Sequence, residues 1–268
     1  MQSTALALMA CDKVRDINKY PEVPVYDLIV FCDLGEEPPW VYDQVEFIGK
    51  ACDISGIKFK VLTTDLHGDY MKNFGKRRVV SIPFWTLSPE GKKGKMRRNC
   101  TLDYKIDAIQ KYVRREVLGY RKGQRTKPED EKAHEMHIGF SWEERQRMSE
   151  NPHRMFYNMF PLVEMKKTRA DNYAYIRDTW GLETKASACT FCPFHRNYFF
   201  KYLKDQHQED YRKLIEFDQL LETEQPNTAI NSKLYVSRSR KRIKDLTDQE
   251  CNDAECFMYR DQVIWNGF

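Results

Sequence analysis

The chain has 268 residues, of which 41% are hydrophobic and 13% aromatic, and its formal net charge is +4. This composition excludes a disordered chain, because the apolar side chains can offset the conformational entropy lost on folding. The apolar runs are short and interrupted by charges, which excludes a membrane-spanning helix, and the residues after Met1 lack the basic and apolar regions of a secretory signal.

Helices and strands are predicted to alternate at the start of the chain. The hydrophobic spacing predicts helix, strand, helix and strand in that order, over residues 3–14, 26–31, 40–51 and 57–62. This alternation is typical of a parallel sheet with crossover helices. At this length we expect one α/β core with an appended subdomain.

The later elements are less regular. Between residues 68 and 98 the pattern breaks into a loop with a short strand at 79–84 and a Gly- and Lys-rich turn, which is typical of a mobile lid. Ser141 and Glu144 form a capping-box signal at the start of a helix. Further elements are predicted as a helix at 103–117, a strand at 135–140, a helix at 168–180 and a long amphipathic helix at 199–223.

The eight cysteines are the most informative residues. We expect a cytoplasmic protein, in which cysteines are metal ligands, nucleophiles or buried apolar residues and not disulfides. Cys189 and Cys192 are two residues apart and precede a proline, so both sulfurs can face one metal ion or cluster. A redox dithiol or two buried cysteines would give the same spacing.

Other cysteines can complete a four-ligand site. Cys100, Cys251 and Cys256 stand in polar or charged surroundings, where core positions are not expected, and one of them or His195 would supply the fourth ligand. The remaining cysteines lie inside predicted helices or strands, where a small buried side chain is the better interpretation: Cys11, Cys32 and Cys52.

The chain resembles a known family across nearly its whole length. The segments that carry the resemblance, in order, are FCDLGEEPPWVY (31–42), RNCTLDYKI (98–106), IGFS (138–141), FPL (160–162) and SACTFCPF (187–194). Together they are similar to the phosphoadenosine-phosphosulfate reductase-like proteins of bacteria and phages, within the adenine nucleotide alpha-hydrolases, the PP-loop ATP pyrophosphatases. The resemblance implies a Rossmann-like parallel sheet in a nucleotide-binding core over residues 1–145, with a basic lid loop at 68–98, and a helical cysteine-containing subdomain over 146–268.

The family binds phosphates with a glycine-rich loop that leads into its first helix. Only the tail of that signature is present here, and it includes Ser3 and Thr4; the strand and glycines would lie before Met1. Either the recorded start is late or the loop is lost, and we favour a late start. Weaker candidates for phosphate contacts are Lys105, Arg97, Arg98 and Arg114.

Two aspartates follow predicted strands, where open α/β sheets place ligand-binding groups. Asp33 is a candidate to face the adenosine or a magnesium ion, and Asp65 receives the same interpretation. A turn or helix cap is an equal alternative for each. With Ser3 and Lys105, Asp33 completes the candidate catalytic set.

The resemblance implies an enzyme that uses ATP or a related adenine nucleotide with Mg²⁺ and adenylates an acceptor. Such an enzyme would then transfer sulfur, or it would reduce a sulfate group in the manner of a sulfonucleotide reductase. A [4Fe–4S] cluster, or alternatively Zn²⁺, would be bound by Cys100, Cys189, Cys192 and one of Cys251 or Cys256. The basic runs near 92–98 and 238–244 suit nucleic-acid phosphates, so DNA or tRNA is a candidate partner. The alternative is a non-catalytic, metal-stapled module that binds nucleic acid.

Overall fold

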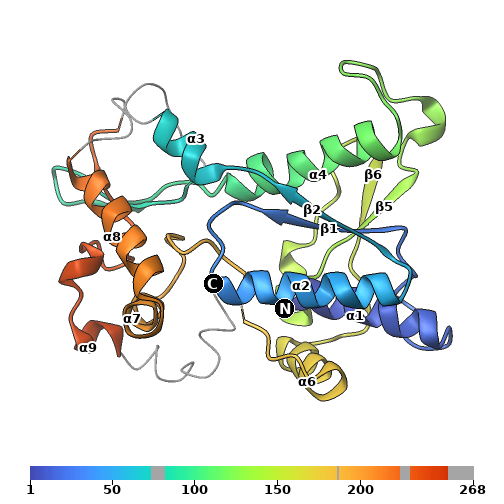
Figure 1. Ribbon diagram of the computed structural model, residues 1–268. Helices are drawn as coiled ribbons and strands as arrows, with labels where there is room; N and C mark the ends of the chain where they lie inside the picture. Colours follow the sequence, from blue (N-terminus) through green and yellow to red (C-terminus); the bar gives the residue numbers. More distant parts are fainter. Residues whose placement is uncertain (74–81, 186, 224–229, 253–268) are drawn as a thin grey trace. The chain divides into compact units, whose positions relative to one another are not determined.

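The computed structural model describes residues 1–73, 82–185, 187–223 and 230–252 (Figure 1). The chain is mixed α/β and forms two compact units. Unit 1 comprises residues 1–31, 42–61 and 111–184, and unit 2 comprises residues 32–41, 62–110 and 185–268. These units do not coincide with the expected halves 1–145 and 146–268, because strands β1 (Leu28–Asp33) and β2 (Lys58–Thr63) each pass from unit 1 into unit 2.

The other elements follow in chain order. The helices are α1 (Gln2–Arg15), α2 (Pro39–Ile54), α3 (Leu66–Lys72), α4 (Asp107–Tyr112), α5 (Pro161–Glu164), α6 (Arg169–Trp180), α7 (Asn197–Gln206), α8 (Gln208–Thr223) and α9 (Asp248–Cys251). The remaining strands are β3 (Trp85–Leu87), β4 (Lys93–Lys95), β5 (His134–His137), β6 (Phe156–Met159) and β7 (Lys233–Tyr235). Turns of π-helix at 101–106 and 113–117 extend α4 at both ends.

The strands form three small sheets within the described residues. β1 pairs with β2, β5 pairs with β6 in parallel, and β3 is the middle strand of the antiparallel order β4–β3–β7. No helix in the described parts of the chain has the length and apolar character needed to cross a membrane.

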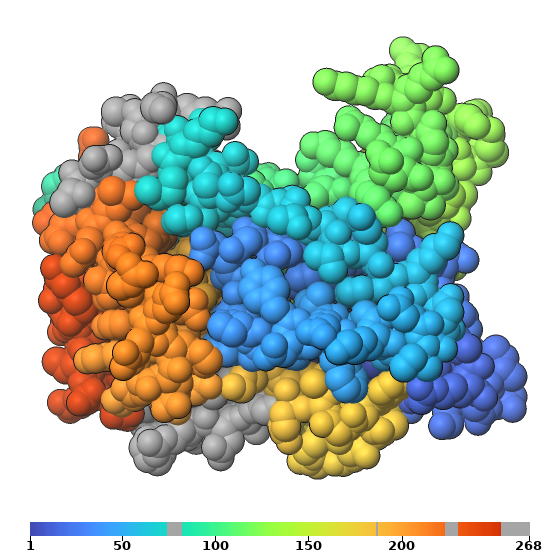
Figure 2. Space-filling view, viewed as in Figure 1, coloured from blue at the N-terminus to red at the C-terminus, as the bar shows by residue number. Residues whose placement is uncertain are grey.

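Unit 1 is built around α1. Its residues from Ala5 to Cys11 are all buried, because α1 packs against α5 and α6 and against apolar side chains of α2 such as Ile48 and Cys52. A helix that is buried on every side must be apolar on every side, which explains its run of Ala, Leu and Met. The loop between residues 118 and 133 projects from this unit (green in Figure 2).

Unit 2 combines the antiparallel sheet with α7, α8 and α9. α8 packs against α7 and β7, and α7 packs against α9 (orange to red in Figure 1). An aromatic cluster lies beside α8, with the Phe217 ring 4.9 Å from Phe191, 5.7 Å from Tyr70 and 6.0 Å from Phe84 between ring centroids. Such clustered rings contribute apolar burial and favourable edge-to-face contacts.

Most predicted elements are confirmed, with shifts at their ends. The helix expected at 168–180 is α6, where Thr168 forms a capping box with Asp171 and Gly181 ends the helix at a φ of +65°. The strand expected at 26–31 begins at Leu28 and continues to Asp33, and the strand expected at 135–140 is limited to β5. The helix expected at 103–117 is present as α4 with its two π-helical extensions.

Three expectations are corrected. The long helix expected at 199–223 is two helices, because the backbone of His207 leaves the helical region and its ring packs against Trp40, with centroids 5.1 Å apart. Ser141 precedes only a short 3₁₀ turn and does not cap it; its hydroxyl donates to the Glu144 carboxylate at 3.3 Å. In the strand expected at 79–84, residues 79–81 lie outside the described residues and 82–84 are not a strand.

Candidate functional site

The paired cysteines of unit 2 lie on a tight turn. The Cys192 amide donates to the Cys189 carbonyl at 2.9 Å, and the His195 amide donates to the Cys192 carbonyl at 3.0 Å. The His195 ring stabilises the turn. Its Nε2 forms a hydrogen bond with the Cys189 carbonyl at 2.9 Å, and its face stacks on Phe199 with centroids 3.5 Å apart. The turn therefore has a fixed backbone and presents both thiols from one short loop.

His195 supports this loop and is not free to bind a metal through Nε2. Burial lowers the pKa of His195 to about 4, while hydrogen bonds to the backbone at Cys189 and Ala188 act in the opposite direction. The ring is therefore neutral at pH 7. His195 was one of the candidates for the fourth metal ligand, and its Nε2 instead contacts the backbone of the turn.

A buried ion pair lies beside the turn. The Glu37 side chain is 0% exposed, and its Oε1 accepts from Lys105 Nζ at 3.3 Å while its Oε2 accepts from Ser187 Oγ at 3.0 Å. Burial lowers the pKa of Lys105, but the Glu37 carboxylate and then the Cys189 thiol outweigh burial and raise it overall. Lys105 is therefore a fixed positive charge next to the cysteine turn.

The thiols of Cys100, Cys189 and Cys192 influence one another electrostatically. Burial, then the Glu37 carboxylate and Cys192, raise the pKa of Cys189, and Lys105 opposes them. Burial raises the pKa of Cys192 to about 11. Cys100 also raises this pKa, and the positive charge of Arg98 lowers it. Without a bound cation, Cys189 and Cys192 are therefore protonated at pH 7.

The ends of β1 and β2 meet the helix that carries Lys105. Cys32 donates its S–H to the Tyr104 carbonyl at 3.1 Å, and the Thr64 hydroxyl lies 3.2 Å from the same carbonyl. The Thr64 amide donates to the Asp33 carbonyl at 2.8 Å. Burial of Cys32, which was expected from its strand position, is confirmed.

The two candidate aspartates both organise local backbone. Asp33 Oδ1 accepts from the Gly35 amide at 2.8 Å, which forms a turn directly after β1. Asp65 Oδ1 accepts from the Gly68 amide at 2.6 Å and caps the N-terminus of α3. The turn and cap roles are therefore present for both, and a ligand contact from either would be in addition to them.

The basic candidates divide between the units. Arg97 and Arg98 are exposed residues of unit 2, where the Arg98 guanidinium lies 5.5 Å from the Phe194 ring. Arg114 belongs to unit 1, where its guanidinium covers the Tyr120 ring at 4.8 Å and bonds the Gln124 carbonyl.

The C-terminal cysteines have separate environments. Cys251 is buried in α9, contrary to the expectation from its acidic sequence neighbours, because α9 packs against α7. Its electrostatic partners include Asp248 and Lys201. Cys256 lies outside the described residues.

Ser3 and Thr4 lie near the start of α1 in unit 1. A Cβ on Gly139 would approach the Ser3 amide nitrogen to 2.6 Å, so only glycine permits this close contact between α1 and the 139–144 loop. The Gln2 side-chain amide donates to Glu144 at 2.8 Å and holds the same two segments together.

Glu144 is the charged centre of that contact. It is buried, its Oε1 lies 3.0 Å from the Arg169 guanidinium, and it also pairs with Arg147. Burial raises the pKa of Glu144, but Arg169 and Arg147 outweigh burial and lower it overall. The expected capping role of Glu144 is thus replaced by a link between the start of α1 and the start of α6.

Sequence reasoning missed Glu37 as a site residue. It stands in a run of two glutamates before two prolines, which favoured a turn, yet its carboxylate is fully buried. A buried carboxylate requires a partner of opposite charge. The sequence signal that could have identified Glu37 was Lys105, which lies in another of the segments that resemble the family.

The thiols fit a soft metal ion or cluster by their chemistry. Thiolates are the usual ligands of zinc and of iron–sulfur clusters, and the nearby positive charges of Lys105 and Arg98 favour the deprotonated thiols. Within the described residues no three Cys, His, Asp or Glu side chains converge as a ready metal-binding group. Binding would therefore draw Cys100, Cys189 and Cys192 together and release their protons.

Acidification is expected to destabilise the cysteine turn through His195. Because the pKa of this residue is about 4 in the folded protein and near 6.5 when unfolded, the unfolded state binds more protons between these values. The contribution of the neutral His195 ring to the free energy of unfolding is fully present above about pH 6.5. The free energy of unfolding falls by about 3 kcal/mol as the pH falls toward about 4. Urea unfolding at pH 7.0 and 4.5 measures this loss.

The variant His195→Gln isolates this contribution. Its free energy of unfolding should be lower at pH 7 and should fall less than that of the wild type on acidification, because no ring remains to be protonated. His153→Gln, in unit 1, serves as the control. An acid sensitivity of His195→Gln equal to that of the wild type would contradict this explanation.

Comparisons of the chain with protein-family models, with curated proteins and with solved structures found no match in any of the three.

Proposed function

We propose that this protein is an adenine-nucleotide-dependent enzyme of the sulfur-transfer or reductase-like type, in which Cys100, Cys189 and Cys192 hold a metal or iron–sulfur centre. The observation that carries the proposal is the tight turn that presents Cys189 and Cys192 from one loop, beside the ion pair of Lys105 and Glu37. A metal-binding turn next to a fixed positive charge is suited to a negatively charged substrate.

The distribution of the family-like segments supports the proposal. Three of them, at 31–42, 98–106 and 187–194, contribute the contact of Cys32 with the Tyr104 carbonyl and those of Glu37 with Lys105 and Ser187 in unit 2. In unit 1 the start of α1 meets the 139–144 loop through Gln2 and Glu144.

The finer fold assignment is part of the proposal. We regard β1, α2 and β2 as one crossover unit of a Rossmann-like sheet, because the helix connects two strands that pair with each other. Asp33 is the last residue of β1 and Thr64 directly follows β2, and such sheets bind ligands at these strand ends.

ATP or a related adenine nucleotide would be bound with Mg²⁺, for which Asp33 supplies a carboxylate. In unit 2, Lys105, Arg97 and Arg98 are the proposed phosphate ligands, and Asp65 is a further polar candidate. In unit 1, Ser3 and Thr4 near the start of α1 stay separate candidates that the sequence predicts. An acceptor attacks the α-phosphorus, the bond to the bridging oxygen breaks, and pyrophosphate leaves as the acceptor becomes adenylated. When bound, the metal centre would supply sulfur or electron-transfer chemistry. We place this activity in the cytoplasm.

The nucleotide chemistry is tested by incubating the metal-loaded protein with ATP and Mg²⁺, with water as the acceptor, and measuring AMP and pyrophosphate by chromatography. We expect equal amounts of both products, and Asp33→Asn should lower the rate more than about tenfold, because the amide keeps the turn but loses the charge that binds Mg²⁺. Asp43→Asn, on the exposed part of α2, is the matched control. Absence of both products would overturn the enzyme proposal and favour the non-catalytic binding module.

A further inference from the structure

A row of side chains crosses one face of the sheet β4–β3–β7 in unit 2. Trp85 on β3 stands directly opposite Lys95 on β4 and Tyr235 on β7. Residues opposite each other in antiparallel strands share a face of the sheet, so Lys95, Trp85 and Tyr235 form a continuous row with two aromatic rings.

Positive charges surround the central ring of this row. The cationic atoms nearest the centroid of the Trp85 ring are Lys95 Nζ at 5.3 Å, Arg240 Cζ at 5.4 Å and Arg238 Cζ at 5.9 Å. Arg240 is held in place because it donates to the carbonyls of Thr86 and Gly94. Lys95 and Arg238 are exposed, and their long side chains can turn from the ring toward an anion.

The row is joined to the cysteine turn. The Trp85 indole Nε1 donates to the Pro193 carbonyl at 2.7 Å, directly after Cys192. The next residue, Phe194, is half-buried and lies under Lys95, whose Nζ is 4.7 Å from the ring centroid. The aromatic and basic surface therefore continues to the proposed metal centre.

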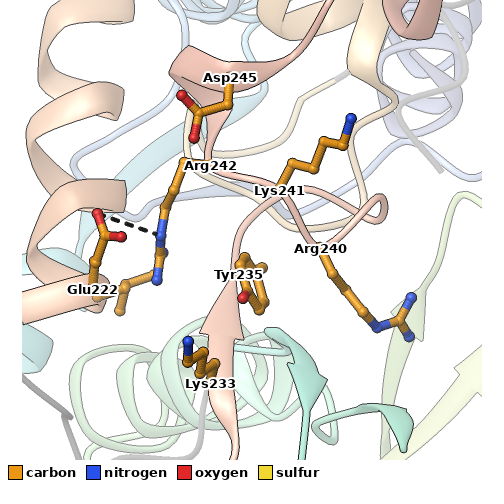
Figure 3. Close-up of a pocket in the computed structure, with 8 residues that line it drawn as sticks. Glu222, Lys233, Tyr235, Arg240, Lys241, Arg242 and Asp245 are labelled. Carbon is orange, nitrogen blue, oxygen red and sulfur yellow. Dashed lines mark ion pairs between the residues drawn. The ribbon is translucent and has the colours of Figure 1, made fainter. Parts of the chain in front are cut away.

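A pocket of about 470 Å³ opens at the other end of the row, where Tyr235 lies between Arg240 and Arg242 (Figure 3). Arg242 is buried and paired with Asp218 at 3.3 Å, and it stabilises β7. Lys233 and Lys241 are exposed residues of the pocket wall. Glu222 and Asp245 also line this pocket, and Lys241 pairs with Glu250 at 2.7 Å, so the charge of the pocket is mixed.

We propose that this face binds single-stranded nucleic acid, with bases stacked on Trp85 and Tyr235 and phosphates paired with Lys95, Arg98 and Arg238. Partly exposed rings flanked by exposed cations match a ligand that alternates flat bases with negative charges. A duplex hides the faces of its bases and would use only the cations. The inference deepens the proposed function by naming the partner class and the surface that would lead it to the cysteine turn.

Fluorescence anisotropy with labelled 12-nucleotide oligo(U) RNA, oligo(dT) DNA and a 12-base-pair duplex tests the proposal, without ATP and over 50–200 mM KCl. We expect tighter binding of single strands than of the duplex. The triple variant Lys95→Ala, Arg98→Ala and Arg238→Ala should weaken binding more than about tenfold and reduce the salt slope by about 2, because each lost phosphate contact contributes about 0.7. The two single strands show whether RNA or DNA is preferred.

The control variant Arg121→Ala, Lys122→Ala and Arg125→Ala removes the same charge from exposed positions in unit 1 and should bind as the wild type does. Trp85→Phe should retain binding, and Trp85→Ala should lose about tenfold or more. Equal affinity for duplex and single strands, or equal loss in the two triple variants, would overturn the proposal. Because the assay needs no turnover, oligonucleotide binding without AMP formation would overturn the enzyme proposal alone.

Discussion

The variant Cys189→Ala is expected to lose the bound metal almost completely. Cys189 and Cys192 lie on one turn held by His195, so removal of either thiol leaves a soft cation with too few ligands for its usual four-coordinate site. Cys100→Ala should have the same effect, because Cys100 is the proposed third ligand and its charge acts on the Cys189 thiol. Protein purified without oxygen is analysed for iron, labile sulfide and zinc per chain.

Control and discriminating variants make the result specific. Cys52→Ala changes a buried cysteine of unit 1 and should retain the metal. Cys251→Ala and Cys256→Ala identify the fourth ligand, and the one that loses metal supplies it. A brown sample with iron and sulfide supports a cluster, and a colourless sample with stoichiometric zinc supports the alternative. A folded Cys189→Ala protein with its full metal content would show that the ligands are elsewhere.

The second large effect is expected when the buried pair of Glu37 and Lys105 is broken. Glu37→Gln leaves the Lys105 ammonium, whose side chain is 28% exposed, without its counter-charge, which should lower the free energy of unfolding by about 1–3 kcal/mol. Because the pKa of Lys105 is raised in the folded protein, its stabilising effect is complete below its unfolded value near 10.5 and is lost only at higher pH. Urea unfolding at pH 7 measures the change.

A double-mutant cycle separates the pair from its surroundings. Glu37→Gln with Lys105→Met should lose less stability than the two single changes combined, because no unpaired charge remains. Lys50→Met serves as the control, since Lys50 and Glu46 form an exposed pair at 2.6 Å that should contribute less than about 1 kcal/mol. If Glu37→Gln cost no more than Lys50→Met, the carboxylate would not be paired and buried as described.

The local elements of the fold follow from short sequence patterns. The apolar run of α1 is typical of a helix that is buried on every face. Thr168 and Gly181 mark the two ends of α6, because a cap and a left-handed residue satisfy local backbone groups. The spacing of Cys189 and Cys192 predicts a loop that can present two thiols, and the structure has that turn.

Other features depend on contacts between distant residues. The break at His207 depends on the ring of Trp40, and burial of Cys251 depends on packing between α9 and α7. The periodicity of the sequence does not reveal contacts between distant residues. For this reason one long helix at 199–223 and an exposed Cys251 were expected. The assignment of His195 to the turn likewise required the position of the Cys189 carbonyl.

The sequence by itself therefore determined the order of most helices and strands, the pair of cysteines and the basic runs, because these arise from neighbouring residues. Only the tertiary structure decided that Glu37 is fully buried, that it pairs with Lys105 and Ser187, and that Trp85 is tied to the cysteine turn. These contacts join residues 68, 150 and 108 positions apart, and charge burial over such separations is set by the packing of the folded chain.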